Sequence, residues 1–220
     1  EDVESLPQSG VSATVPALAG CDASAQRQPR PPNILFVLAD DLGYADVGCY
    51  GARDYPTPHI DALAGAGIRL TQGYANSCVC SPTRVALTTG RYQQRPPVGL
   101  EEPTNQPTQD FRLPPGHPTL PSILKLAGYR TALIGKWHIG FNPNAGPLDY
   151  GYDHFFGYPG GGTNYYEQPG GGAPQTPDAL FLNRDPVRRP GYLTDLLGDE
   201  AVSWIRSGTQ PFFLRLHFSP

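Results

Sequence analysis

Asn33-Ile-Leu-Phe-Val-Leu-Ala39 is a nearly continuous apolar run, rich in residues that favour β-structure and preceded by two prolines. A run of this kind predicts a fully buried strand of a parallel sheet. Asp40 and Asp41 follow directly, so two carboxylates stand where the strand ends, which is where open α/β sheets bind ligands. Adjacent carboxylates repel each other, and calcium or magnesium would relieve the repulsion. We expect exposed carboxylates here, either in a metal site or in a solvated turn.

The rest of the chain alternates between strand and helix patterns. We predict strands near residues 33–39, 68–74, 130–135 and 212–218, and helices near 58–65, 81–89, 119–127 and 193–206. Strands separated by helices predict an α/β fold with a mainly parallel sheet covered on both faces. The Pro- and Gly-rich segments 93–118 and 141–191 are predicted to be long loops, and loops of that length in a compact domain are commonly functional.

The segment Cys80-Ser-Pro-Thr-Arg84 has the composition of a helix start, and Gly90 stands where a C-cap glycine belongs. Residues four apart share a helix face, so Arg84 is expected beside Cys80. A thiol at a positive helix end near a cation has a lowered pKa, and the same place suits an anionic ligand. The plainer alternative is a buried or disulfide-bonded cysteine in an ordinary helix.

A third motif is Gly135-Lys-Trp-His-Ile-Gly140, which closes a predicted strand. In extended chain Lys136 and His138 project to the same face. A cation beside a titratable imidazole can hold an anion and move a proton. The alternative is an edge strand whose Lys and His are solvated.

Together the three motifs resemble those of the sulfatase family. The resemblance is to its formylglycine-dependent members, of the arylsulfatase and N-acetylgalactosamine-6-sulfatase type. Cys80-x-Pro-x-Arg84 is similar to the sulfatase signature, the strand ending in Asp40-Asp41 is similar to the family's opening strand, and Gly135–Gly140 is similar to its Gly-Lys-Trp-His-Leu-Gly. The resemblance spans residues 33–220. It implies an alkaline-phosphatase-like α/β/α sandwich, with residues 33–220 as the N-terminal portion of the catalytic domain.

The resemblance also implies a mechanism for sulfate ester hydrolysis. Cys80, oxidised to formylglycine by a formylglycine-generating or anaerobic sulfatase-maturating enzyme, would be the nucleophile. Calcium would be bound by Asp40, Asp41 and the modified Cys80. Arg84 and Lys136 would offset charge, and His138 would take a proton. Two alternatives stay open, namely a phosphoester or phosphonate ester hydrolase of the same superfamily and a non-catalytic fragment.

The predicted loop after the third motif contains candidate substrate residues. Asn164, Tyr165 and Tyr166 either line the pocket for a sulfated small molecule or glycan, or are turn residues. In relatives a sulfate-binding histidine and further metal ligands follow the position where this chain stops, so we expect it to be truncated before the C-terminal half and to need the remainder of the catalytic domain. His217 falls within a predicted strand and is interpreted as a packing or surface residue.

Residues 1–32 are rich in Ser, Ala, Pro and Gln and show no periodicity, which predicts a disordered tail or a signal or lipoprotein remnant. Leu18-Ala-Gly-Cys21 resembles a bacterial lipoprotein cleavage site, so Cys21 is a candidate lipid anchor. We therefore expect a periplasmic, outer-surface or secreted protein. The net charge is −4 and no basic run is present, so nucleic acid is not an expected partner.

Overall fold

The computed structural model describes residues 30–100, 112–141, 144–168 and 176–219. The chain divides into two compact units, residues 1–30 and residues 31–220. The predicted tail at 1–32 and the candidate anchor Cys21 therefore fall, apart from residues 30–32, outside the described residues.

In the described part of the chain, six strands form one mixed sheet. Its order is β1 (Ile34–Ala39), β6 (Phe212–Phe218), β2 (Arg130–Lys136), β3 (His154–Tyr158), β4 (Phe181–Leu182) and β5 (Asp185–Pro186). The first four strands are parallel, and β4 and β5 are antiparallel additions. The predicted α/β class with a mainly parallel sheet is confirmed.

All four predicted helices are present, with ends within two residues of the predicted ones. They are α1 (Pro58–Ala66), α2 (Cys80–Thr89), α3 (Leu120–Leu126) and α4 (Leu193–Arg206). Short 3-10 helices occur at Tyr44–Asp46, Gly48–Tyr50, Pro97–Gly99 and Pro147–Tyr150. No helix in the described ranges is both long and apolar enough to cross a bilayer.

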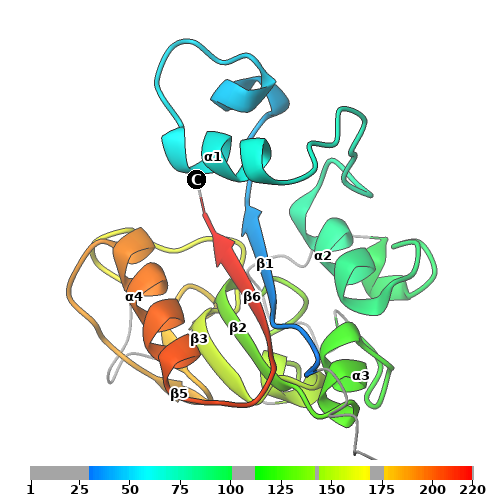
Figure 1. The fold of residues 1–220 in the computed structure, drawn as a ribbon. Coiled ribbons are helices and arrows are strands. Elements are labelled where there is room, and N and C mark those ends of the chain that lie inside the picture. The colour runs from blue at the N-terminus through cyan, green and yellow to red at the C-terminus, as the bar shows by residue number, and fades with distance from the viewer. Residues whose placement is uncertain (1–29, 101–111, 142–143, 169–175, 220) are drawn as a thin grey trace, which may run out of the picture. The chain divides into compact units, whose positions relative to one another are not determined.

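Two hydrophobic clusters lie on opposite faces of the sheet, because successive side chains of a strand point to opposite sides. On β6, Phe213 joins the cluster that includes Val85 of α2, whereas Leu214 joins the cluster that includes Leu197 of α4. Figure 1 shows α4 on one side of the sheet and α2 and α3 on the other. The α4 residues that face the sheet recur every three or four positions, as one face of a helix requires. The result is the expected three-layer arrangement.

The strand β1 differs from its prediction, because it is not fully buried. Leu35 and Val37 are each 51% exposed. Among the described residues β1 pairs only with β6, so it lies at the edge of the sheet. An apolar run indicates burial on both faces, but only the neighbours available to a strand determine how much of it is covered.

Two further predictions about elements are wrong. Residues 68–74 form turns and irregular backbone, and Ile68 is 91% exposed. β-propensity describes how well a side chain fits a pleated, half-buried surface, and no described strand offers one here. The segment 141–191 was predicted as loop, but it contains β3, β4 and β5. The aromatic run of β3 is short and lies among glycines, so the sequence shows no clear strand periodicity there.

Candidate active site

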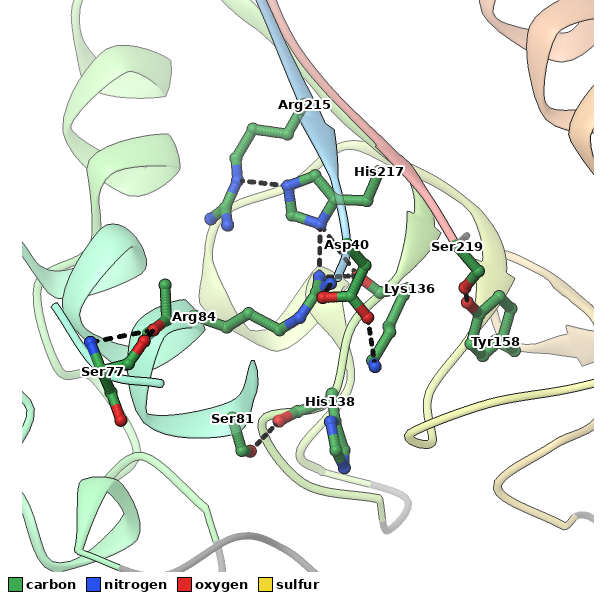
Figure 2. Close-up of polar contacts among 11 residues, drawn as sticks. Asp40, Ser77, Ser81, Arg84, Lys136, His138, Tyr158, Arg215, His217 and Ser219 are labelled. Carbon is green, nitrogen blue, oxygen red and sulfur yellow. Dashed lines mark hydrogen bonds and ion pairs between the residues drawn. The ribbon is translucent and has the colours of Figure 1, made fainter. Parts of the chain in front are cut away.

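Asp40 lies just past β1, where its backbone N–H donates to the carbonyl oxygen of Phe218 at 3.0 Å. Its carboxylate is shared by two cations, with Arg84 Nη2 2.9 Å from Oδ1 and Lys136 Nζ 2.5 Å from Oδ2. Figure 2 shows the carboxylate between these two groups. Asp40 is only 8% exposed, so the predicted exposure is wrong for this residue, because β1, α2 and β2 all converge on it. Asp41 is exposed as predicted.

The charge state of Asp40 follows from its neighbours. Burial by itself would raise the pKa of Asp40, but the charge of Arg84 and the hydrogen bond from Lys136 outweigh burial and hold that pKa below its ordinary value of 3.8. Asp40 is therefore ionised at neutral pH. One buried carboxylate thus faces two buried cations.

Arg84 connects α2 to the sheet. Its guanidinium is 1% exposed, and Nη1 donates to the carbonyl oxygen of Lys136 at 2.8 Å. The helix positions it because α2 begins at Cys80 and ends before Gly90, which adopts the left-handed conformation with φ 66°. Arg84 therefore stands one turn after Cys80, which is half-buried at the first helical position.

His138 lies next to the start of α2. The strand β2 ends at Lys136, and His138 adopts a left-handed backbone with φ 58°, so the extended chain predicted for both residues is wrong for His138. Its carbonyl oxygen accepts a hydrogen bond from the hydroxyl of Ser81 (Figure 2). A Cβ atom at Gly161 would lie 2.9 Å from the His138 ring, so the absence of a side chain at this position leaves room for the imidazole.

Backbone strain is concentrated near these residues. Among the described residues three non-glycine residues have positive φ, and two of them are Asp41, with φ 56°, and His138. Left-handed backbone costs such residues on the order of 1–3 kcal/mol and occurs preferentially at functional sites. The site therefore combines strain, buried cations and a helix start.

Residues 32–219 match the family model described as Sulfatase. The chain belongs to the sulfatase family. This confirms the family expected from the three sequence motifs.

Curated relatives include sulfatases of several kinds. The sulfatase chain is 42% identical to mouse steryl-sulfatase over 85% of the present chain. It is 41% identical to human arylsulfatase A over 59% of the present chain. It is 40% identical to N-acetylgalactosamine-6-O-sulfatase of Bacteroides thetaiotaomicron, again over 59% of its length. The chain spans 31%, 26% and 25% of these relatives, respectively.

Solved structures give the same fold. The crystal structure of Ps i-CgsB aligns with a TM-score of 0.77 and 34% identity, over 86% of this sulfatase chain and 45% of that one. A structure titled BT4656 in complex with its substrate D-glucosamine-2-N,6-O-disulfate aligns with a TM-score of 0.66 and 27% identity, over 84% and 34% of the two chains. The predicted alkaline-phosphatase-like sandwich agrees with these neighbours.

The calcium that the family implies can be tested against the residues present. Asp40 and Asp41 offer hard oxygen donors of the kind calcium prefers. Both oxygens of Asp40 already bond to Arg84 and Lys136, and the described residues contain no group of three or more His, Cys, Asp or Glu able to hold a metal. The two aspartates have the donor chemistry for part of a calcium site, with Asp41 exposed and Asp40 shared with Arg84 and Lys136, and a full coordination shell requires further ligands.

The candidate substrate residues lie in an aromatic cluster. The ring of Tyr165 stacks on Tyr192 with centroids 5.6 Å apart, and Tyr166 lies 5.3 Å from the same ring. Burial, then the charges of Tyr192, Asp40 and Asp41, raise the pKa of Tyr165. The Oδ1 atom of Asn164 accepts hydrogen bonds from the backbone of Tyr166 and Glu167, so its carbonyl group holds the turn.

Two residues of the site were missed by the sequence interpretation. His217, interpreted there as a packing or surface residue, is 1% exposed and lies 2.8 Å from Arg84 through Nδ1. Arg215 is equally buried and contacts His217 (Figure 2). The available signal was their spacing of two, which places both on one face of a strand otherwise composed of Phe and Leu.

Proposed function

We propose that the protein carrying this chain is a sulfuric ester hydrolase that cleaves sulfate monoesters of aryl alcohols or carbohydrates. The observation that carries the proposal is the buried pair of cations, Arg84 and Lys136, sharing the single carboxylate of Asp40 beside the start of α2. Family membership supports the same reaction. Because the chain spans less than half of the relatives described above, the activity is proposed for the complete gene product.

The charge balance supports an anionic substrate. Two cations and one carboxylate leave one net positive charge at the cluster, and buried charge is costly unless it is paired. Arg84 Nε is buried and lacks a hydrogen-bond partner among the described residues. An unsatisfied buried donor costs about 1–3 kcal/mol, which an anionic oxygen would recover. The guanidinium and the ammonium then stabilise negative charge on the transferring group.

The remaining roles fall to Cys80 and His138. Cys80 at the first position of α2 benefits from the partial positive charge of a helix N-terminus. Formylglycine made from Cys80 would supply the oxygen nucleophile as its hydrated aldehyde, and calcium at Asp40 and Asp41 would supply further positive charge. His138, whose backbone carbonyl accepts from Ser81 and whose ring lies close to Gly161, is suited to accept a proton at a ring nitrogen.

The rival substrate is a phosphate monoester. Its dianion requires more positive charge than a sulfate monoanion does. The described residues offer two cations and one candidate calcium position, at Asp40 and Asp41, rather than the second metal position that a phosphate dianion favours, so the site favours the sulfate. Tyr165, Tyr166 and Tyr192 favour an ester whose alcohol carries a ring, because sugar and aryl rings stack on tyrosine. In keeping with this, Ps i-CgsB has also been crystallised with k-i-k-neocarrahexaose.

The test uses the complete gene product, produced together with a formylglycine-generating enzyme. We expect turnover of 4-nitrophenyl sulfate in preference to 4-nitrophenyl phosphate, and formylglycine at position 80 in the tryptic peptide Leu70–Arg84. Lys136→Met should lower kcat/KM for the sulfate by roughly a hundredfold or more. Lys125→Met is the matched control, because Lys125 is half exposed and pairs with Asp153 instead.

Each outcome separates the hypotheses. Preference for the phosphate ester would replace the proposal with the rival hydrolase. Full activity with unmodified Cys80 would contradict the formylglycine mechanism, and a matured protein that binds sulfate without turning over any ester would support the non-catalytic alternative. Lipid attachment at Cys21 and a location outside the cytoplasm stay predictions from sequence, which membrane fractionation of a Cys21→Ala variant would test.

A further inference from the structure

The face of β6 that packs against α2 changes character along the strand. Phe213 belongs to the apolar cluster with Val85, whereas Arg215 and His217 continue the same face toward Asp40. Both are 1% exposed. A guanidinium and an imidazole are costly to bury unless their polar atoms are satisfied, so their contacts indicate what they do.

His217 lies between two guanidinium groups. Its Nδ1 is 2.8 Å from Arg84 Nη1, and its Nε2 is 3.2 Å from Arg215 Nε. Guanidinium groups only donate hydrogen bonds, so a protonated imidazole, which also only donates, is excluded between them. Nδ1 lies 2.9 Å from the carbonyl oxygen of Lys136. A neutral imidazole has one acceptor nitrogen, so it can accept from only one of the two guanidinium groups. We assign the proton to Nδ1, which donates to the Lys136 carbonyl oxygen, because Nε2 can then accept from Arg215, whose Nε is the partner it contacts. Nδ1 and Arg84 Nη1 are then two donors that share the Lys136 carbonyl oxygen, and the contact between them is not a hydrogen bond.

Arg215 is fixed at its other end by neutral oxygens. Its Nη1 donates to Thr88 Oγ1 at 2.8 Å and to the Tyr152 hydroxyl at 3.0 Å. Burial raises the pKa of Tyr152, so the phenol stays neutral beside the guanidinium. Thr88 stands one turn after Arg84 on α2, so both residues lie on the same helix face.

These contacts close a ring across the seam between α2 and the sheet. Arg84 reaches from α2 to the Lys136 carbonyl oxygen, His217 donates to the same oxygen, and Arg215 links His217 back to Thr88 of α2. A carbonyl oxygen has two lone pairs and can accept both donors. The closed ring holds the Arg84 guanidinium in one place relative to Asp40 and Lys136.

We propose that His217 and Arg215 are positioning residues that set the Arg84 guanidinium in the anion site, with His217 acting as a neutral, single-tautomer spacer between two cations. Neither residue touches the substrate in this proposal. An apolar side chain would fill the same space, but it would leave the Arg215 Nε–H without its acceptor and one lone pair of the Lys136 carbonyl unused. It would also remove the imidazole beside Arg84 Nη1, so that Asp40 and the Lys136 carbonyl oxygen alone would hold this guanidinium.

The main test measures inorganic sulfate binding by calorimetry on the complete gene product, with and without replacement of His217. His217→Leu keeps the volume and removes both polar atoms, and we expect sulfate to bind about tenfold more weakly. His217→Asn keeps an N–H donor near the place of Nδ1 and should bind sulfate within about threefold of the unchanged protein. His154→Leu is the matched control, because His154 is partly buried and bonded to Glu200, away from Arg84.

A purely structural role predicts a different pattern. In that case the leucine and asparagine variants would shift the melting temperature alike, without a difference in sulfate affinity between them. Equal sulfate affinity in a folded His217→Leu variant would overturn the proposal. The inference rests on the proposed function only for the choice of sulfate as the probe.

A second measurement does not depend on sulfate, and its first part uses the unchanged protein. Nitrogen-15 NMR of the imidazole should show His217 neutral with its proton on Nδ1 from about pH 5 to about pH 8. In Arg215→Lys, which lacks Nε, the ring should lose this single tautomer. A proton found on Nε2, or a ring that titrates near the ordinary pKa of about 6.5, would overturn the proposal whether or not the protein hydrolyses sulfate esters.

Discussion

Asp40 binds two buried cations at once, and this changes what its replacement should do. A carboxylate at a strand end would ordinarily be expected to contribute function without much stability. Here its removal would leave Arg84 and Lys136 facing each other in a buried place. Asp41, its neighbour, is exposed, so its removal would not leave buried cations facing each other.

Asp40→Asn should therefore lower both activity and stability, whereas Asp41→Asn should lower activity alone. Breaking a buried ion pair costs about 3–5 kcal/mol, and substitution of an exposed residue changes stability by about 0.5 kcal/mol or less. Urea unfolding of the two variants, alongside their turnover of 4-nitrophenyl sulfate with added calcium, would measure both quantities. Equal stability of the two variants would contradict the counter-ion role of Asp40.

His217 should make stability sensitive to mild acid. Burial first, then the charges of Arg215 and Arg84, lower the pKa of His217 well below 6.5. Because the unfolded chain then binds the extra proton, the unfolding free energy should fall as the pH drops below about 6.5, by up to about 1.4 kcal/mol per pH unit. The lowered pKa of Asp40 contributes a further loss only as the pH falls below about 3.8, so the slope that begins near pH 6.5 starts before it.

The groups facing the His217 ring are Arg84 from α2, Arg215 from β6, Lys136 from β2 and, beyond them, Asp40. Denaturant unfolding at a series of pH values would measure the slope. His217→Asn, which cannot titrate, should remove the part of the slope that begins near pH 6.5. An unchanged slope in this variant would assign the acid sensitivity to other groups.

The loop that follows β3 acts on the site through one glycine. A Cβ atom at Gly161 would lie 2.9 Å from the His138 ring, whereas one at Gly162 would meet nothing within 4 Å. The obstructed atoms are the far end of a side chain, so the ring can move at little cost in stability. Gly161→Ala should therefore reduce kcat by about tenfold or more without lowering the melting temperature much, because it displaces a proposed proton acceptor.

Gly162→Ala is the matched control for this loop and should leave kcat unchanged. Steady-state kinetics and thermal unfolding of both variants would decide. Full activity in Gly161→Ala would show that the position of His138 is not critical.

The helix α4 contributes stability rather than chemistry. Leu197 is 1% exposed against the sheet, whereas Val202 on the same helix is 46% exposed. Leu197→Ala should destabilise the fold by about 2–5 kcal/mol, while Val202→Ala should cost less than about 1 kcal/mol. Chemical denaturation of the two variants would measure the difference, and similar values would contradict the packing of α4 described here.

The sequence could predict elements with strong periodic patterns and motifs with fixed spacing. The four helices and the strands β1, β2 and β6 were predicted near their observed ends. Burial was predicted less well, because the exposure of Leu35 and the burial of Asp40 depend on which segments meet them in space. Arg215 and His217 could not be assigned to the site for the same reason, since their partner Arg84 is distant in the chain.

The exposed face of β1 should determine whether the isolated 220-residue chain self-associates. Leu35 and Val37 are half exposed on a strand that pairs on one side only among the described residues. Edge strands with exposed apolar side chains favour association. We expect the isolated chain to self-associate as its concentration rises, and Val37→Lys to reduce this, as light scattering after gel filtration would show. A monomer at every concentration would contradict the prediction.

The isolated chain should also show little turnover, even with Cys80 modified. Asp40 and Asp41 provide only part of an oxygen shell, and calcium affinity follows the number and charge of ligands. Calcium titration with 4-nitrophenyl sulfate would test this. Ordinary arylsulfatase activity from the 220-residue chain would show the expectation to be wrong.

The strand order has a consequence for how the molecule is made. β6 is the last strand along the described chain, yet it lies between β1 and β2 and pairs with both. Among the described strands β1 pairs only with β6, so on the ribosome it lacks this partner until β6 emerges, and at about 5–20 residues per second the delay is on the order of ten seconds or more. Throughout that interval the apolar β1 is available to chaperones and to neighbouring chains. Arg84 and Lys136 acquire their final surroundings only when the delay ends.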